Sequence, residues 1–143
     1  MTTSERESAR EPAQPRGLTY RRRHRLTHAR EYDAVYAHKL RKSADLLTVH
    51  LFPTDRTEPR LGLSVGRRVG RAVDRARTKR LIREAFRHLA PTLPSPPEGS
   101  YDVVVSARGR PSGLGECVTL LSALIERAHR EQSRRSAKKD ANG

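Results

Sequence analysis

The pattern of polar and apolar positions first predicts an amphipathic helix over residues 27–40. Tyr32, Val35 and Tyr36 recur at the i, i+3, i+4 spacing of one helical face. Thr27 belongs to the residue types that favour a helix N-cap, so the helix is expected to begin there. The two tyrosines should therefore lie on the same face of this first element.

Three short segments have the character of β-strands. Residues 46–52 and 60–65 are rich in β-forming residues and are separated by the turn-like sequence PTDRTEP, so we expect them to pair as a hairpin. Residues 101–107 contain three consecutive valines. Such a continuous apolar run is typical of a strand that is buried on both faces.

Two more amphipathic helices are predicted over residues 75–89 and 116–130. Gly66 and Gly70 precede the first of them, and Pro91 marks its end. The second has its apolar residues on one face, namely Val118, Leu121, Leu124, Ile125 and Ala128. The succession of elements predicts an α+β fold, a two-layer α-β sandwich in which helices pack on a small mixed sheet of about four strands.

The length of 143 residues suits one domain with a tail at each end. Residues 1–17 are polar and lack periodicity, which predicts a disordered N-terminal tail. The folded domain is expected over residues 18–131. Residues 132–143 are basic, and we expect them to form a disordered C-terminal tail.

Charge narrows the choice of partner. The chain has 30 Lys and Arg against 16 Asp and Glu, for a net charge of +14, which points to a polyanion such as nucleic acid or an anionic membrane surface. No run approaches the roughly 18 apolar residues of a membrane span, so no membrane partner is expected. Cys117 is the only cysteine, which excludes an internal disulfide and fits a reducing compartment. These features predict a cytoplasmic protein.

The helix predicted over residues 75–89 combines an apolar face with a basic one. Its apolar arc contains Leu81, Ile82, Ala85, Phe86 and Leu89, and its opposite arc carries Arg77, Lys79, Arg80, Arg83 and Arg87. Glu84 lies within the basic arc and can pair with Arg80 or Arg87. A solvated surface helix usually mixes both signs of charge. Counterion release on binding a polyanion would offset the self-repulsion of a basic face, so the pattern favours contact with nucleic acid.

The run GLSVGRRVGRAVDRARTKRLIREAF, residues 62–86, resembles the bacterial ribonuclease P protein component. That family carries a strand ending in GLSV, two basic residues, and a helix of pattern R-N-R-x-K-R-x-x-R. The matching residues here are Arg75, Arg77, Lys79, Arg80 and Arg83. Ala76 stands where the family has Asn, so an amide side chain is missing. The segments RLTHAREYDAVY (25–36) and YDVVVSARG (101–109) also resemble the family, which extends the similarity over about residues 20–130.

This resemblance implies that the chain is the protein subunit of ribonuclease P. Such a subunit binds the catalytic RNA and the 5′ leader of precursor tRNA, and assists endonucleolytic removal of the leader. The catalytic centre would lie in the RNA, served by Mg²⁺, with no catalytic residue in the protein and no obligate protein partner. The family's fold also implies a left-handed βαβ crossover.

The resemblance further implies two sets of site residues. The RNA-binding helix and its approach would consist of Arg67, Arg68, Arg71, Arg75, Arg77, Lys79, Arg80, Arg83 and Arg87. A cleft for the single-stranded leader would contain Arg25, Tyr32, Tyr36 and His50, with the aromatic rings as stacking platforms for unpaired bases. The alternative is that both tyrosines simply pack the first helix onto the sheet.

The residues themselves predict no protein active site. The carboxylates are scattered and mostly lie beside arginines, and no Ser/His/Asp or Cys/His arrangement is present. Three other functions would also explain the charge. These are a ribosomal or other structural RNA-binding protein, a nucleoid-type DNA binder, and a stand-alone endonuclease.

Overall fold

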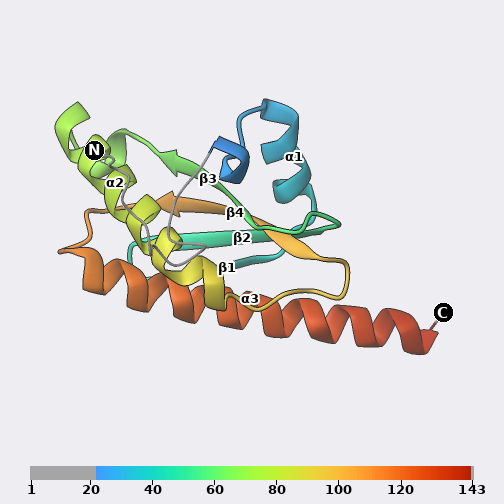
Figure 1. Ribbon diagram of the computed structural model, residues 1–143. Coiled ribbons are helices and arrows are strands. Elements are labelled where there is room, and N and C mark those ends of the chain that lie inside the picture. The colour runs from blue at the N-terminus through green and yellow to red at the C-terminus, as the bar shows by residue number, and fades with distance from the viewer. Residues whose placement is uncertain (1–21, 143) are drawn as a thin grey trace, which may run out of the picture.

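The computed structural model describes residues 22–142 and shows a mixed sheet with helices packed against it (Figure 1). The helices are α1 (Ala29–Ala37), α2 (Ala72–Leu89) and α3 (Leu114–Asn142). Short 3-10 turns form η1 (Arg22–His24), η2 (Arg67–Val69) and η3 (Ala90–Thr92). The strands are β1 (Arg41–Ala44), β2 (Leu47–Thr54), β3 (Arg60–Val65) and β4 (Ser100–Ala107). The predicted α+β fold is confirmed.

The strand order is β1-β2-β4-β3, and only β3 and β4 pair in parallel. The predicted hairpin of residues 46–52 with 60–65 is therefore wrong, because β4 lies between β2 and β3. The hairpin partner of β2 is instead β1, joined by a tight turn in which Asp45 adopts a φ of 51°. The valine-rich β4 takes a central position, where both of its edges and both of its faces are covered. α2 forms the crossover between the parallel strands β3 and β4, and the hand of that crossover stays a prediction of the resemblance.

Side chains alternate along the strands and divide the core into two clusters. On one face, Val103 and Val105 of β4 join the apolar side chains of β2, α2 and α3 in the larger cluster. On the opposite face, Val104 packs with Leu26 and Val35 beneath α1 in a smaller cluster. The predicted apolar face of α2 is confirmed, because Ile82, Ala85 and Phe86 are buried and Leu81 and Leu89 pack against the larger cluster.

The edge of β3 that does not pair with β4 is covered by the segment before α1 and by Tyr32 of α1. The backbone N–H of Leu26 donates to the carbonyl of Leu61 at 3.0 Å. The N–H of Leu63 donates to the hydroxyl of Tyr32 at 3.1 Å. Gly62 lies between these two contacts, and a Cβ atom there would be 2.8 Å from Cζ of Tyr32. Only glycine therefore lets the tyrosine ring approach this strand so closely.

The helix boundaries differ from those predicted, most clearly at the starts of α1 and α2. α1 begins at Ala29 with His28 as its N-cap residue, because the carboxylate of Glu31 accepts the backbone N–H groups of Thr27 and His28 at 3.0 and 3.1 Å. α2 begins at Ala72, and the N–H of Arg71 donates to Asp74 at 3.0 Å. In both helices a carboxylate in the first turn satisfies donors that the helix itself leaves unpaired.

The largest correction concerns the C-terminus. Residues 132–142, predicted to form a disordered tail, continue α3, which runs beneath the sheet and projects beyond it (Figure 1). Contacts distant in sequence hold this part, since Gln132 is buried and accepts a hydrogen bond of 2.7 Å from His38. The tail predicted over residues 1–17 lies outside the described residues.

Candidate nucleic-acid interface

The outer face of α2 displays a row of cations. Arg80 and Arg77 are exposed. Lys79 and Arg83 are partly exposed and lie next to the buried face of α2. Arg67, Arg68 and Arg71 extend the basic surface through η2 toward the start of the helix, and all three are exposed. Ala76 is exposed among them, so the position that carries Asn in the resembling family here offers a methyl group.

These cations differ in their freedom to bind a ligand. Within residues 22–142, no ion pair is made by Lys79, Arg80 or Arg83. Arg87 is already paired, because its guanidinium donates to both oxygens of Glu84 at 2.6 and 2.9 Å. The hydrogen bonds to Glu84 raise the pKa of Arg87 further. Lys79, Arg80 and Arg83 are thus better placed than Arg87 to bind phosphate.

Arg77 also holds the structure around the helix, whereas Arg75 is only partly exposed. Arg77 donates to the carbonyls of Pro111 and Ser112 at 3.1 and 3.3 Å, which fastens the loop before α3. Nε of Arg75 is buried without a hydrogen-bond partner among the described residues. The same loop carries Arg110, whose guanidinium lies 3.0 Å from Asp74. Sequence reasoning missed the role of this loop, since its contacts with α2 span more than thirty positions.

A pocket of about 330 Å³ lies where α2 meets the segment before α1. Arg25, Tyr32 and Arg83 line it together with Leu26, Leu61 and Leu63. Arg25 and Tyr32 were predicted for the leader cleft and Arg83 for the basic helix. The structure brings these two predicted sites together at one pocket.

Tyr32 is tied to the protein by its hydroxyl group. This hydroxyl accepts from the N–H of Leu63 and donates to the carbonyl of Leu26 at 3.5 Å. The ring is partly buried against β3. Tyr32 therefore packs the first helix onto the sheet, as the alternative interpretation expected. Only the part of its surface that is not in this packing faces the pocket.

A second pocket, of about 450 Å³, lies at the β1 edge of the sheet. Tyr36, Lys39, Arg41, Ser43 and His50 line it. The rings of Tyr36 and His50 meet edge to face with centroids 4.9 Å apart, and Tyr36 is 38% exposed. This pocket combines aromatic surface with two cations, the combination that binds an unpaired nucleotide.

The surroundings of His50 favour the neutral form of its imidazole. Burial lowers the pKa of its imidazole, and the neighbouring Arg41 lowers it further. Its Nδ1 is buried and has no hydrogen-bond partner within residues 22–142. Because this nitrogen is buried, the ring offers the pocket its aromatic surface, while Lys39 and Arg41 supply the charge for phosphate.

An ionic cluster, not foreseen from the sequence, fixes α1 on the sheet. Arg60 of β3 is buried and donates to both oxygens of Asp102 at 2.9 and 2.7 Å. Its remaining nitrogen donates to Glu31 of α1 at 2.7 Å. Burial alone would raise the pKa of Glu31, but the backbone hydrogen bonds and Arg60 lower it to about 2. The cluster sets the position of the helix that carries Tyr32 and Tyr36.

The carboxylates near the basic helix pair with arginines. No group of three or more His, Cys, Asp or Glu side chains is arranged to hold a metal ion within residues 22–142. The acidic residues at the interface are instead engaged by cations, as Asp74 is by Arg110 and Glu84 by Arg87. Hard cations such as Mg²⁺ need oxygen ligands that are free to bind them.

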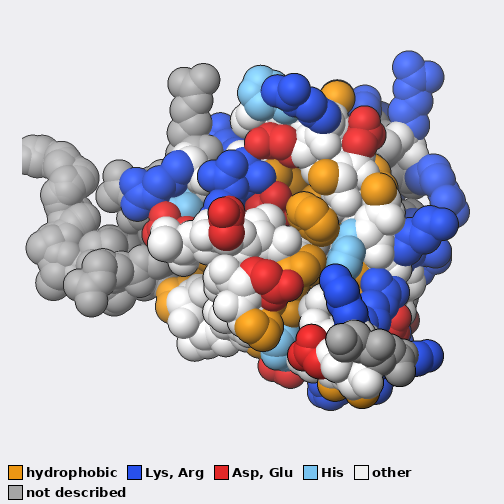
Figure 2. Space-filling view, turned by 90° about the vertical axis from the view of Figure 1, so that its right-hand side faces the viewer, with side chains coloured by type: hydrophobic (Ala, Val, Ile, Leu, Met, Phe, Trp, Pro, Cys, Tyr) orange, Lys and Arg blue, Asp and Glu red, His pale blue; other side chains and the backbone are white. Residues whose placement is uncertain are grey.

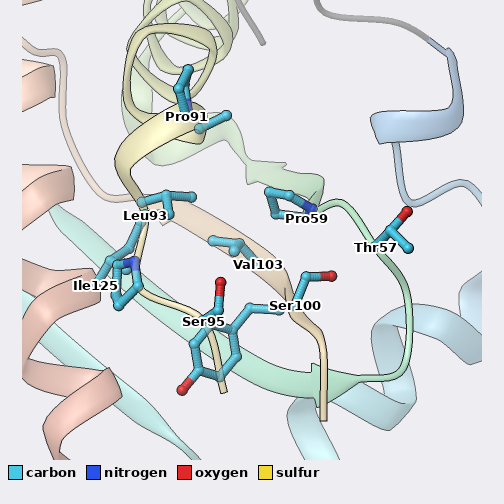
Figure 3. A pocket seen from close by; sticks show the side chains of 11 residues that line it. Thr57, Pro59, Pro91, Leu93, Ser95, Ser100, Val103 and Ile125 are labelled. Atoms are coloured by element: carbon cyan, nitrogen blue, oxygen red, sulfur yellow. The ribbon is translucent and has the colours of Figure 1, made fainter. Parts of the chain in front are cut away.

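A third pocket, of about 220 Å³, lies apart from the basic surfaces, where η3 and the loop after it cover the start of β4 (Figure 3). Its walls are largely apolar, with Pro91, Leu93, Val103 and Ile125 among them. Ser100 also lines it, and its hydroxyl has no hydrogen-bond partner in the described part of the chain. No cation lines this pocket, so it does not belong to the nucleic-acid interface.

Comparison with known proteins decides the family. The Ribonuclease P family model matches residues 20–134. The chain belongs to the ribonuclease P protein family. It is 37% identical over 110 residues to the ribonuclease P protein component of Methylococcus capsulatus, which covers 76% of this chain and 82% of that one. It is 35% identical over 97 residues to the ribonuclease P protein component of Syntrophus aciditrophicus, covering 68% and 78%.

Solved ribonuclease P proteins share the fold. The Staphylococcus aureus RNase P protein superposes with a TM-score of 0.61 at 23% identity, over 73% of this chain and 94% of that one. At this level of identity the likeness concerns the fold alone. Within residues 22–142, no helix is long and apolar enough to cross a membrane.

Proposed function

We propose that this chain is the protein subunit of ribonuclease P and assists removal of the 5′ leader from precursor tRNA. The observation that carries the proposal is the pocket at which the basic helix and the predicted leader cleft meet. Arg83 lies on α2 and also lines the pocket with Arg25 and Tyr32. One protein surface can thus contact the catalytic RNA and the adjoining leader at the same time.

In this proposal the leader crosses the face of the sheet on which α1 lies. It would enter at the pocket lined by Arg83 and reach the pocket of Tyr36 and His50 at the β1 edge. Three strand spacings separate β3 from β1, which is about 14 Å. Cations lie at both ends of this leader path, and aromatic rings along it offer surfaces on which bases can stack.

The catalytic centre would lie in the RNA partner. The carboxylates near the basic helix are neutralised by arginines, which supports a protein that supplies binding energy and positive charge. Mg²⁺ would be held by the RNA and would stabilise the charge that develops on the reacting phosphate. The protein's cations would help to bring the RNA and the precursor together.

Reconstitution tests the proposal. Purified protein, the cognate catalytic RNA and a precursor tRNA are combined at low Mg²⁺, and leader release is followed with each component omitted in turn. We expect efficient cleavage only when protein and RNA are both present. Cleavage by the protein alone would place the chemistry in the protein. If the RNA is active alone at high Mg²⁺ but the protein never helps, the chain is a structural RNA-binding or DNA-binding protein instead.

The pocket at the β1 edge yields a second prediction. Tyr36→Ala removes the exposed ring that lies against His50, so the reconstituted enzyme should bind precursor tRNA about tenfold more weakly, since one stacked base contributes about 1–3 kcal/mol. Binding of mature tRNA, which lacks the leader, should not change. Tyr36→Phe keeps the ring and serves as the matched control. Equal weakening of precursor and mature tRNA binding would show that Tyr36 does not contact the leader.

A further inference from the structure

The second half of α3 is anchored to the turn that joins α1 to β1. Its sheet-facing stripe is apolar up to Ala128 and then becomes polar with Gln132 and Arg135. Arg135 donates to the carbonyls of His38 and Lys39 at 3.1 and 2.9 Å. These carbonyls end α1, where a helix leaves acceptors unpaired and favours a nearby cation. The end of α3 is therefore held beside the pocket at the β1 edge.

A row of cations follows one side of this anchored helix. Its members share the spacing i, i+3, i+7 and i+11, are all exposed, and will be called the distal basic stripe: Arg127, Arg130, Arg134 and Lys138. Glu131 borders the stripe and lies 2.7 Å from Lys42, 2.9 Å from Arg135 and 3.7 Å from Arg134 of the stripe itself. Its charge is thus shared mainly with two cations outside the stripe. In the view onto the end of α3, Lys and Arg side chains gather above that end, near a central strip of hydrophobic side chains (Figure 2).

Two residues connect the stripe to the pocket at the β1 edge. Lys39 lines the pocket, and its carbonyl accepts from Arg135. Ser43 also lines the pocket, and its carbonyl accepts from Arg127 at 3.5 Å. The surface of the pocket thus continues directly onto α3.

We propose that the distal basic stripe binds the upstream part of a long leader, after the leader has crossed β1. This inference rests on the proposed function, because it extends the leader path described above. Exposed arginines and a lysine at helical spacing match a phosphate backbone without selecting a base sequence. The stripe lies at the β1 edge, whereas α2 packs at the β3 edge, so the RNA bound by α2 does not account for it.

The test compares leader lengths in the reconstituted enzyme. Precursors with leaders of about 4 and about 16 nucleotides span the range that one compact single-strand binding fold covers. The variant Arg130→Ala, Arg134→Ala and Lys138→Ala removes three cations, and alanine favours the helix, so α3 should persist. The double variant Lys139→Ala and Asp140→Ala alters the same turns without changing net charge, and is the matched control.

We expect the triple variant to bind the long-leader precursor about tenfold more weakly and the short-leader precursor normally. The slope of log affinity against log salt should fall by about 2 for the long leader only, at roughly 0.7 per single-strand phosphate contact. Equal affinity of the triple variant and the wild type for the long leader overturns the inference, as does an equal loss for both leaders. If instead the wild type itself binds precursor no better than mature tRNA, the proposed function has failed.

Discussion

Replacing Lys79, Arg80 and Arg83 together by alanine is expected to weaken binding of the catalytic RNA about 100-fold. These three side chains lie on the outer side or border of α2 and form no ion pair within residues 22–142. Each contact with phosphate contributes about 1 kcal/mol net, and three such contacts multiply to this loss. The slope of log affinity against log salt should also decrease by about 2 to 3. Filter binding or fluorescence anisotropy over a salt series measures both quantities.

The same helix provides the control. Glu84→Gln combined with Arg87→Gln removes a cation that is already paired and leaves the net charge unchanged. We expect this double variant to bind the RNA nearly as well as the wild type. If both variants lost a comparable amount of RNA affinity, binding would depend on the integrity of the helix and not on the unpaired cations. Circular dichroism and thermal unfolding of each variant verify that α2 is intact.

Arg60→Ala should be the most destabilising of the substitutions considered. It leaves the carboxylates of Asp102 and Glu31 without their shared cation, at positions where their side chains are only 5% and 22% exposed. Removing one partner of a buried ionic cluster costs about 3–5 kcal/mol. Urea denaturation should show this decrease in the free energy of unfolding. Arg56→Ala, an exposed arginine in the neighbouring loop, should have little effect and is the control.

Acid adds an independent measurement on the same cluster. The folded state lowers the pKa of Glu31 from an ordinary value of 4.5 to about 2. A lowered pKa stabilises the fold above the ordinary value, so this contribution is lost as the pH falls from about 4.5 toward 2. Part of the lowering comes from Arg60, and the Arg60→Ala variant should therefore lose less stability over that interval than the wild type. An unchanged acid dependence would show that Arg60 does not stabilise the Glu31 carboxylate.

The pattern of polar and apolar residues predicted those helices and strands whose buried face follows from their own sequence. The β3 strand at residues 60–65 and the apolar face of α2 agree with the structure because each follows from the period of its own side chains. β1 was missed, because its sequence RKSA has no strand-like pattern and depends on pairing with β2. The predicted strand partner of β3 was wrong for a related reason. Whether β3 pairs with β2 or with β4 depends on the arrangement of the whole sheet.

The site shows the same division. Helical geometry predicted which cations of α2 point outward. It did not predict whether Glu84 would pair with Arg80 or with Arg87, and the structure shows the pair with Arg87. Arg77 and Arg60 find their partners 34 and 42 residues away. The helical state of residues 132–142 likewise depends on His38 and Lys39, which are nearly a hundred residues distant. Spacing along the chain carries no information on such contacts.

The covering of the β3 edge has a consequence for the protein before it meets any RNA. A free strand edge is a template on which another chain can pair and begin to aggregate. Here the carbonyl of Leu61 is already engaged by Leu26 before α1, and the N–H of Leu63 by Tyr32 within α1. At the other border of the sheet, the short β1 carries the exposed Arg41, and a charged side chain on an edge strand disfavours pairing with a second copy. Both edges of the described sheet are thus protected against strand addition, which lowers the risk of aggregation before the chain meets its RNA partner.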